Sequence, residues 1–338
     1  MEPPVDIESG CADLAPPSPG LDLSVCVVTW NARDVLVACL QSLCDIRQHN
    51  AITYEVIVVD NGSTDDTVEV VRRDFPEVQL IAMPENVALA AAYNQGVRAG
   101  RGKHFLVLNN DIVLLDDCLS QMVQFLDENA RAGAVAARLL SPDRSTQVRY
   151  YPQQLPTVGS LVAELFWLNR IWPGNPWNSR GGAGDWDPEK PAAMEQVPGA
   201  CMMARRTVFE QVGLLDAGFR FWYEDVDFCR RCRRASWELC YLPQARVIHL
   251  GGASVHLMQY NQTSLFRLRS LLRYARKHFS RNQAAAVRFA VAAVMLLRLP
   301  VALFLAGWPV ARVRKYWSGV AATYLRVLRE SVAGSSYS

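Results

Sequence analysis

Two short stretches of the chain carry side-chain oxygens that could bind a metal ion or move a proton. The first is Asn109–Asn110–Asp111, at the end of the apolar run HFLVLN, and the second is Glu224–Asp225–Val226–Asp227. Carboxylate and amide oxygens are the ligands that Mg²⁺ and Mn²⁺ prefer, often one or two carboxylates together with substrate phosphates. A carboxylate within hydrogen-bond distance of a hydroxyl can also act as its base. The two stretches therefore suggest a metal site and a general base.

Each stretch also has an ordinary structural explanation. Asn-Asn-Asp at a strand end can simply form an Asx turn, and acids followed by RRCRR fit the first turn of a solvated helix. Trp222, Tyr223 and Phe228 beside the acids favour a walled site instead. His249 closes ARVIHLGG and is a candidate further metal ligand, although a strand histidine is more commonly a core or edge residue.

A third carboxylate, Asp60, lies in VVDNGSTDDT (58–67). Ser63 or Thr64 as the N-cap explains the start of the helix expected at 63–75, but capping does not explain Asp60, which precedes the glycine turn. A carboxylate there can accept a hydrogen bond from a base or a ribose. Neither G-x-G-x-x-G nor the P-loop pattern occurs, which weakens a dinucleotide reading and removes a P-loop.

The elements that must position these residues alternate between β-branched runs and helical periodicity. Strands are expected at 23–30, 54–60, 78–83 and 103–109, and helices at 32–46, 63–75 and 88–100. This alternation predicts an α/β fold with a doubly wound, nucleotide-binding sheet. Ligands of such sheets lie beyond the carboxyl ends of the strands, so the polar residues there should converge on one edge.

Beyond this sheet the pattern is weaker. Residues 141–198 are rich in Pro, Gly and Trp and show no period, which is typical of a long functional loop. A strand and helix are expected in 197–213, a loop entering a helix in 219–237, and two short strands joined by a turn in 238–252. Cys229 and Cys232 in CRRC lack zinc-like partner spacing and are expected to share one packed helix face.

Composition limits the class of protein. A net charge of +2 argues against nucleic acid as a partner. The nine scattered cysteines fit a reducing cytosol better than a disulfide framework. Residues 1–22 include a proline-rich acidic stretch without a signal-peptide core and are expected to be a disordered leader.

From about residue 253 to 338 the chain is expected to be helical, and it is both apolar and basic. Residues 284–308 resemble a membrane span, but Arg288 and Arg298 interrupt it and only 13 uncharged residues separate Arg298 from Arg312, fewer than the roughly 20 that cross a bilayer. A helix lying in the interface, or a re-entrant hairpin, fits the region 284–311 better than a crossing. An ordinary core or oligomer helix pair is the alternative.

Taken together, these segments resemble glycosyltransferase family 2, which has the GT-A fold, and in particular its bacterial rhamnosyltransferase-like members. About 230 residues carry the resemblance in the family's order: LSVCVVTWN (23–31), YEVIVVDNGSTDDT (54–67), NVALAAAYNQGVRAGRGKHFLVLNNDIVL (86–114), VPGACMMARRTVFEQVGLLDAGFRFWYEDVDFCRRCRRASW (197–237) and LPQARVIHLGGAS (242–254). The glycine-rich turn that relatives carry after the residue matching Asn86 reads VALAAAYNQG here.

The resemblance implies a nucleotide-sugar donor and assigns its contacts. Thr29, Asn31 and Asp60 would surround the base and ribose, and Asn86 and Asn94 match donor-side amides of the family. The remaining implied donor and metal residues are Asn109, Asn110, Asp111 and His249.

Within that set, Asp111 would hold a divalent cation, Mg²⁺ or Mn²⁺, which bridges the donor diphosphate. Asn109 or Asn110 would assist, and His249 would supply a further metal or diphosphate contact. Asp225 would deprotonate the acceptor hydroxyl with support from Glu224 and Asp227. Family members invert the anomeric centre by direct displacement.

The predicted protein is therefore an inverting glycosyltransferase with a GT-A domain at 23–252 and a membrane-associating region at 253–338. It would move a sugar, with a deoxyhexose such as rhamnose as the leading candidate, to a lipid-linked or polysaccharide acceptor at the cytoplasmic face of a bacterial inner membrane. The alternatives are a degenerate relative that binds glycans or partner proteins, and a sugar nucleotidyltransferase, whose basic glycine-rich loop is absent. The sequence does not indicate an oligomeric state.

Overall fold

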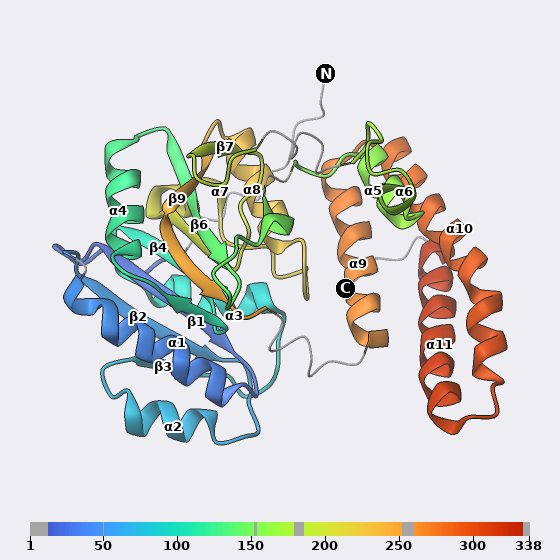
Figure 1. The fold of residues 1–338 in the computed structure, drawn as a ribbon, viewed down its shortest axis with the longest axis horizontal. Helices are drawn as coiled ribbons and strands as arrows, with labels where there is room; N and C mark the ends of the chain where they lie inside the picture. Colours follow the sequence, from blue (N-terminus) through green and yellow to red (C-terminus); the bar gives the residue numbers. More distant parts are fainter. Residues whose placement is uncertain (1–12, 50, 152–153, 179–185, 252–259, 334–338) are drawn as a thin grey trace.

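The computed structural model describes residues 13–49, 51–151, 154–178, 186–251 and 260–333 (Figure 1). Its strands are β1 Leu23–Thr29, β2 Tyr54–Asp60, β3 Gln79–Ala82, β4 His104–Asn109, β5 Ile112–Leu114, β6 Ala132–Leu140, β7 Ala192–Met194, β8 Cys201–Arg205 and β9 Glu238–His249. Its α-helices are α1 Arg33–Asp45, α2 Thr67–Asp74, α3 Leu89–Ala99, α4 Cys118–Glu128, α5 Val158–Leu165, α6 Leu168–Ile171, α7 Arg206–Val212, α8 Glu224–Arg234, α9 Tyr260–His278, α10 Arg281–Ala306 and α11 Ala311–Ala333. Short 3₁₀ turns follow at Ile46–His49 and Val148–Tyr150.

The described strands form one mixed sheet in the order β3-β2-β1-β4-β8-β6-β9-β5, with β7 beside β9. The first four are parallel, as the alternating pattern predicts, and β8 then pairs antiparallel with both β4 and β6. All seven residues of β1 are buried, as expected for an apolar strand in the interior of a helix-covered sheet. The predicted α/β architecture is confirmed for the sheet and the helices that cover it.

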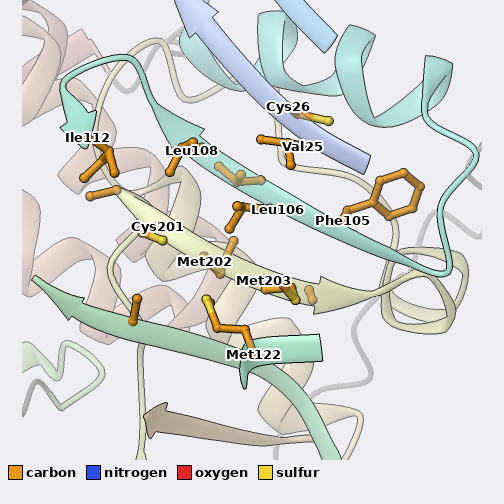
Figure 2. Close-up of a cluster of buried hydrophobic side chains, with 14 of the residues drawn as sticks. Val25, Cys26, Phe105, Leu106, Leu108, Ile112, Met122, Cys201, Met202 and Met203 are labelled. Atoms are coloured by element: carbon orange, nitrogen blue, oxygen red, sulfur yellow. The ribbon is translucent and has the colours of Figure 1, made fainter. Parts of the chain in front are cut away.

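The core is continuous across the junction where the strand direction changes. Leu106 and Leu108 of β4 lie opposite Met203 and Cys201 of β8, and Met122 of α4 packs below them (Figure 2). Cys229 and Cys232 are both buried on one side of α8, as predicted for a packed helix face.

Three expected elements differ in the structure. The helix at 63–75 begins only at Thr67, because Ser63 and Thr64 hydrogen-bond to Asn31 and do not cap the helix. The prediction of two strands in 238–252 is wrong, because β9 is one strand that passes the turn-like LPQA segment through an irregularity in its pairing with β6. Part of the aperiodic segment 141–198 folds into α5, α6 and β7.

The predicted leader is partly anchored. The amides of Ala15 and Ser18 donate to the carbonyls of Arg98 and Arg101, and the buried Arg206 side chain donates to the Ala15 carbonyl. Contacts to the sheet domain therefore begin before Leu23, and residues 1–12 lie outside the described range.

The C-terminal region is helical, as predicted, and has two parts. Helix α9 packs on the sheet domain through Ser270, which donates to the carbonyl of Phe221, whereas α10 and α11 form a neighbouring hairpin (Figure 1). Among the described helices α10 alone is long and apolar enough to cross a membrane, with a mean hydropathy of 2.3 over 18 residues. Core helices of soluble proteins share that property.

Candidate active site

The carboxyl ends of the parallel strands bring the predicted polar residues to one edge. Thr29 pairs in register with Asp60, and its neighbour Val28 pairs with Asn109. The buried Asn110 amide donates to the Thr29 hydroxyl at 3.0 Å. The loops after β1, β2 and β4 are thus joined directly, as expected from the sheet topology.

Only one of the two carboxylate oxygens of Asp60 accepts a hydrogen bond in the structure. Its Oδ2 accepts from the amide of Ser63 at 3.0 Å, while Oδ1 is buried and has no hydrogen-bond partner among the described residues. An unsatisfied buried carboxylate oxygen is costly unless a ligand supplies a donor. Gly62, at φ 74°, allows the turn to pass the 85–86 backbone, where a Cβ would lie 2.5 Å from the Glu85 carbonyl carbon.

An open cavity of about 260 Å³, lined by Thr29 and by Asn61, the residue after Asp60, lies between these loops and the C-terminal region. Thr29, Trp30, Asn61 and Asn86 line it from the sheet side, and the far wall is contributed by Arg220, Phe221, Gln262 and Phe266. The Arg220 guanidinium stacks 5.3 Å from the centre of the Phe266 ring. Polar groups facing an aromatic wall suit a nucleoside.

Two of the predicted donor-binding amides have structural partners. The Asn31 carboxamide oxygen accepts from the amide of Thr64 at 2.7 Å, which ties the first two loops together. The buried Asn94 side chain both donates to and accepts from the backbone of Leu215, at 2.7 and 3.0 Å. Asn94 therefore holds the loop that leads to the acidic cluster and does not reach toward the cavity with its amide.

Asn109 is held by a residue that sequence reasoning missed. The Tyr93 hydroxyl lies 3.0 Å from the Asn109 side-chain oxygen and 3.1 Å from the Leu108 carbonyl. Burial first, then the charges of Glu224 and Asp111, raises the pKa of Tyr93 well above its ordinary value. Tyr93 therefore stays protonated and can donate to the side-chain oxygen of Asn109.

Asp111 and His249 meet at the end of the sheet because β5 and β9 are antiparallel, with Ile112 opposite His249. The imidazole Nε2 lies 3.5 Å from Asp111 Oδ1, and both side chains are buried. On the other side of the ring, Nδ1 lies 3.0 Å from Oε1 of Gln147. A partner that fixes the second ring nitrogen is typical of metal-ligating histidines.

This donor set fits a divalent cation that completes its shell with substrate oxygens. No group of three or more His, Cys, Asp or Glu residues gathers in metal-binding geometry in the described ranges, so Asp111 and His249 would be the protein's contribution. One carboxylate and one imidazole suit Mn²⁺ better than Mg²⁺, which favours oxygen alone.

The acids Glu224 and Asp225 occupy the first turn of α8 and face the same region. Asp225 Oδ2 accepts from the amide of Gly199 at 2.9 Å, and Ala200 in turn accepts from the amide of Asn109. A Cβ at position 199 would lie 3.1 Å from that of Asp225, so glycine permits this close approach. Gly199 and Ala200 thus connect the two predicted clusters.

The backbone before these acids is strained. Trp222 and Tyr223 have φ values of 63° and 69°, which non-glycine residues rarely adopt. Such strain is concentrated at functional sites, at about 1–3 kcal/mol per residue. Burial raises the pKa of both the Glu224 and Asp225 carboxyls, and the charge of Asp225 adds to the rise at Glu224.

Asp227 lies on the other side of α8, outside the site. It is fully buried, with Arg231 at 2.9 Å, Lys277 at 2.8 Å and His278 at 2.7 Å. Burial alone would raise the pKa of Asp227, but the hydrogen bond to His278 and the charges of Arg231 and Lys277 outweigh it and hold that pKa well below its ordinary value. Asp227 therefore fastens α9 to the helix that carries Asp225.

We expect Asp227→Ala to lower the free energy of unfolding by about 3–5 kcal/mol, because it leaves the partly buried Arg231 without its carboxylate and the buried His278 without its hydrogen-bond partner. The matched control is Arg131→Ala, which removes an exposed ion pair with Glu238 and should change stability by less than about 1 kcal/mol. Denaturant unfolding followed by circular dichroism measures both. Equal effects of the two substitutions would contradict the fastening role.

Comparison with known proteins now decides the family. The sequence profile described as Glycosyl transferase family 2 matches residues 24–213, and one described as Glycosyltransferase like family 2 matches residues 190–263. The chain belongs to glycosyltransferase family 2. The family 2 match extends over every loop of the site from Thr29 to Gly199.

Individual relatives agree with the family. The chain is 30% identical over 210 residues to N-acetylglucosaminyl-diphospho-decaprenol L-rhamnosyltransferase of Mycobacterium tuberculosis, covering 57% of this chain and 66% of that protein. The alignment thus spans about two-thirds of the relative's length.

Among solved structures, a mannosyltransferase of Pyrobaculum calidifontis in complex with GDP-Man and Mn²⁺ is similar over 96% of this chain and 91% of its own, with a TM-score of 0.53 at 17% identity. GalNAc-T7 with UDP, GalNAc and Mn²⁺ is similar over 68% and 43%, with a TM-score of 0.50 at 16% identity. At these identities the likeness concerns the fold, and it confirms the GT-A-type architecture expected from the sequence.

Proposed function

We propose that this family 2 protein is an inverting glycosyltransferase that moves a sugar from a nucleotide-sugar donor to a hydroxyl of a lipid-linked or cell-surface glycan. The observation that carries the proposal is the placement of Asp225. Gly199 and Ala200 hold it beside the Asn109–Asp111 loop, and Asp111 meets His249 there. A base and a diphosphate-binding pair on one sheet edge are what glycosyl transfer requires.

In the proposed reaction the acceptor hydroxyl attacks the anomeric carbon as the bond from that carbon to the diphosphate oxygen breaks. The hydroxyl proton passes to Asp225, the bonding pair leaves with the nucleoside diphosphate, and the configuration inverts. A divalent cation bound by Asp111 and His249 would neutralise charge on the leaving diphosphate. Asp60 Oδ1 has no hydrogen-bond partner among the described residues and would accept a hydrogen bond from the nucleotide sugar. The 260 Å³ cavity offers room for the nucleobase.

The donor and acceptor classes are supported by the relative's name. The Mycobacterium tuberculosis protein is a rhamnosyltransferase of a sugar-diphospho-decaprenol. We propose a deoxyhexose such as rhamnose as the sugar, a polyprenyl-linked or polysaccharide acceptor, and the cytoplasmic face of a bacterial inner membrane as the location. The apolar, basic C-terminal region supports a membrane surface as a partner.

The test is turnover by the purified full chain with dTDP-rhamnose, UDP-sugars and GDP-sugars in the presence of Mn²⁺. Calorimetric titration with UDP and dTDP, with and without Mn²⁺, separates the alternatives: binding that Mn²⁺ tightens supports the enzyme, and binding without a metal effect favours a degenerate glycan- or partner-binding relative. Failure to bind or turn over any nucleotide sugar would falsify the proposal.

We expect kcat/KM to fall on the acid side at a pH above the ordinary carboxyl range of about 4, because Asp225 must be ionised and burial raises its pKa. Activity should therefore be present above the raised pKa and lost as the pH falls through it. Glu224→Gln should keep this acidic limb. Disappearance of the limb in that variant would assign it to Glu224.

A further inference from the structure

Two segments far apart in the sequence expose apolar side chains next to each other. One is residues 166–172, which follow α5 and include α6, and the other is residues 296–310, the second half of α10 and the turn after it. The most exposed members include Ile171 at 78%, Trp167 at 59%, Leu297 at 68% and Phe304 at 69%. We call these two segments the apolar face. Soluble monomers rarely expose so many large apolar side chains together without a partner.

Direct contacts join the segments. Arg298 donates to the carbonyl of Leu165 at 2.8 Å, and its guanidinium carbon lies 4.1 Å from the centre of the Trp167 ring. Beneath this contact, Leu161 and Leu165 are buried in one cluster with Val291 and Met295 of α10. The α5–α6 segment, which precedes β8 of the sheet, is therefore fixed to the exposed half of α10 (Figure 1).

The charges around the apolar face have one sign. Arg170, Arg312, Arg314 and Lys315 are exposed, and neither residues 165–178 nor residues 281–329 contain an acid. The flanking acids are neutralised, Glu164 by Arg267 and Glu330 by Arg269. Tryptophans beside cations on an apolar surface suit the headgroup region of an anionic bilayer.

The packing of α10 determines how deeply it can insert. Val287, Val291, Val294 and Met295 in its first half are buried against other helices. Only residues 296–306 of the helix and the turn after it remain for a membrane. These 11 helical residues span about 16 Å at 1.5 Å per residue, less than the roughly 30 Å of a hydrocarbon core.

We propose that residues 166–172 and 296–310 form a single surface that inserts into the interface of an anionic lipid bilayer without crossing it. The segment 166–172, which precedes β7 and β8 of the sheet, thus contacts the membrane directly, in addition to the C-terminal helix α10. This inference extends the membrane association in the proposed function but depends on neither donor nor turnover.

The experiment uses the full chain and vesicles of phosphatidylcholine with or without phosphatidylglycerol. The variant Trp167→Ser/Ile171→Ser/Trp172→Ser leaves the C-terminal region intact and should weaken flotation with phosphatidylglycerol vesicles by at least about tenfold, because it removes three inserted apolar side chains. Leu325→Ser, an exposed apolar position on α11 outside the face, should float like the wild type. An unchanged melting temperature establishes that the triple variant is folded.

A single substitution tests insertion of the same surface without the risk that a triple variant misfolds. Ile171→Cys labelled with an environment-sensitive fluorophore should shift to the blue on adding phosphatidylglycerol vesicles. The inference is overturned if that shift is absent, if the triple variant floats like the wild type, or if light scattering shows instead that the variant dissociates a dimer while vesicle binding is unchanged. A protein that binds vesicles but no nucleotide sugar would retain this inference and refute the proposed function.

Discussion

Asp225→Asn is expected to reduce turnover by about 10²- to 10⁴-fold while leaving donor binding close to that of the wild type. The amide is nearly isosteric and its oxygen can still accept the hydrogen bond from Gly199, so the loop between the two acidic clusters should stay in place. The substitution removes the capacity to take the acceptor proton, together with the hydrogen bond that the second oxygen accepts from the amide of Val226.

Steady-state rates and calorimetric donor affinity should be measured on the same preparation. Glu224→Gln is the matched control, since it removes the adjacent carboxyl but not the group held by Gly199, and it should cost less activity. If Asp225→Asn turns over at the wild-type rate, Asp225 is not the base. If donor binding falls in parallel with turnover, the residue has a structural role.

Asp111→Ala is expected to weaken Mn²⁺-dependent nucleotide binding by about 10- to 100-fold, because the protein would keep only His249 at the metal. Titration of UDP or dTDP with and without Mn²⁺ measures the effect. In the absence of metal the variant should bind as weakly as the wild type or slightly better, since a negative charge near the diphosphate has been removed.

Gln147→Leu makes a useful companion variant, because Gln147 contacts His249 at 3.0 Å and is not expected to reach the cation. It should lower metal affinity less than Asp111→Ala does. A variant at Asp111 whose nucleotide affinity still rises on adding Mn²⁺ as much as the wild type's would remove Asp111 from the metal site.

The part of the site that could be predicted is the part set by the parallel strands. Strand periodicity fixes where β1, β2 and β4 end, so Thr29, Asp60 and Asn110 had to meet at one edge. The order of the family motifs then added Asp225 and His249. Local pattern and family resemblance were sufficient to select these residues as candidates, and their roles stay predictions.

The rest depends on contacts between residues distant in the sequence. Asn94 binds the backbone of Leu215, 121 positions later, and nothing in its own helix indicates that its amide is occupied. Gln147 lies in a segment without periodicity, and its role appears only when β9 brings His249 to it. Ser63 and Thr64 are residue types that often cap helices, but here both form hydrogen bonds with Asn31.

Helix α9 has a consequence for anyone who builds chimeras from this protein. Its Phe266 lines the cavity at Thr29 and Asn61, and its Lys277 and His278 hold the helix that carries Asp225. Exchanging everything after residue 252 would therefore replace one wall of the cavity proposed to bind the nucleotide. A graft made at Ser280, where a new helix is capped, would keep that wall. It would also have to keep the α10 side chains that pack on α5 and α9, among them Val291 and Met295.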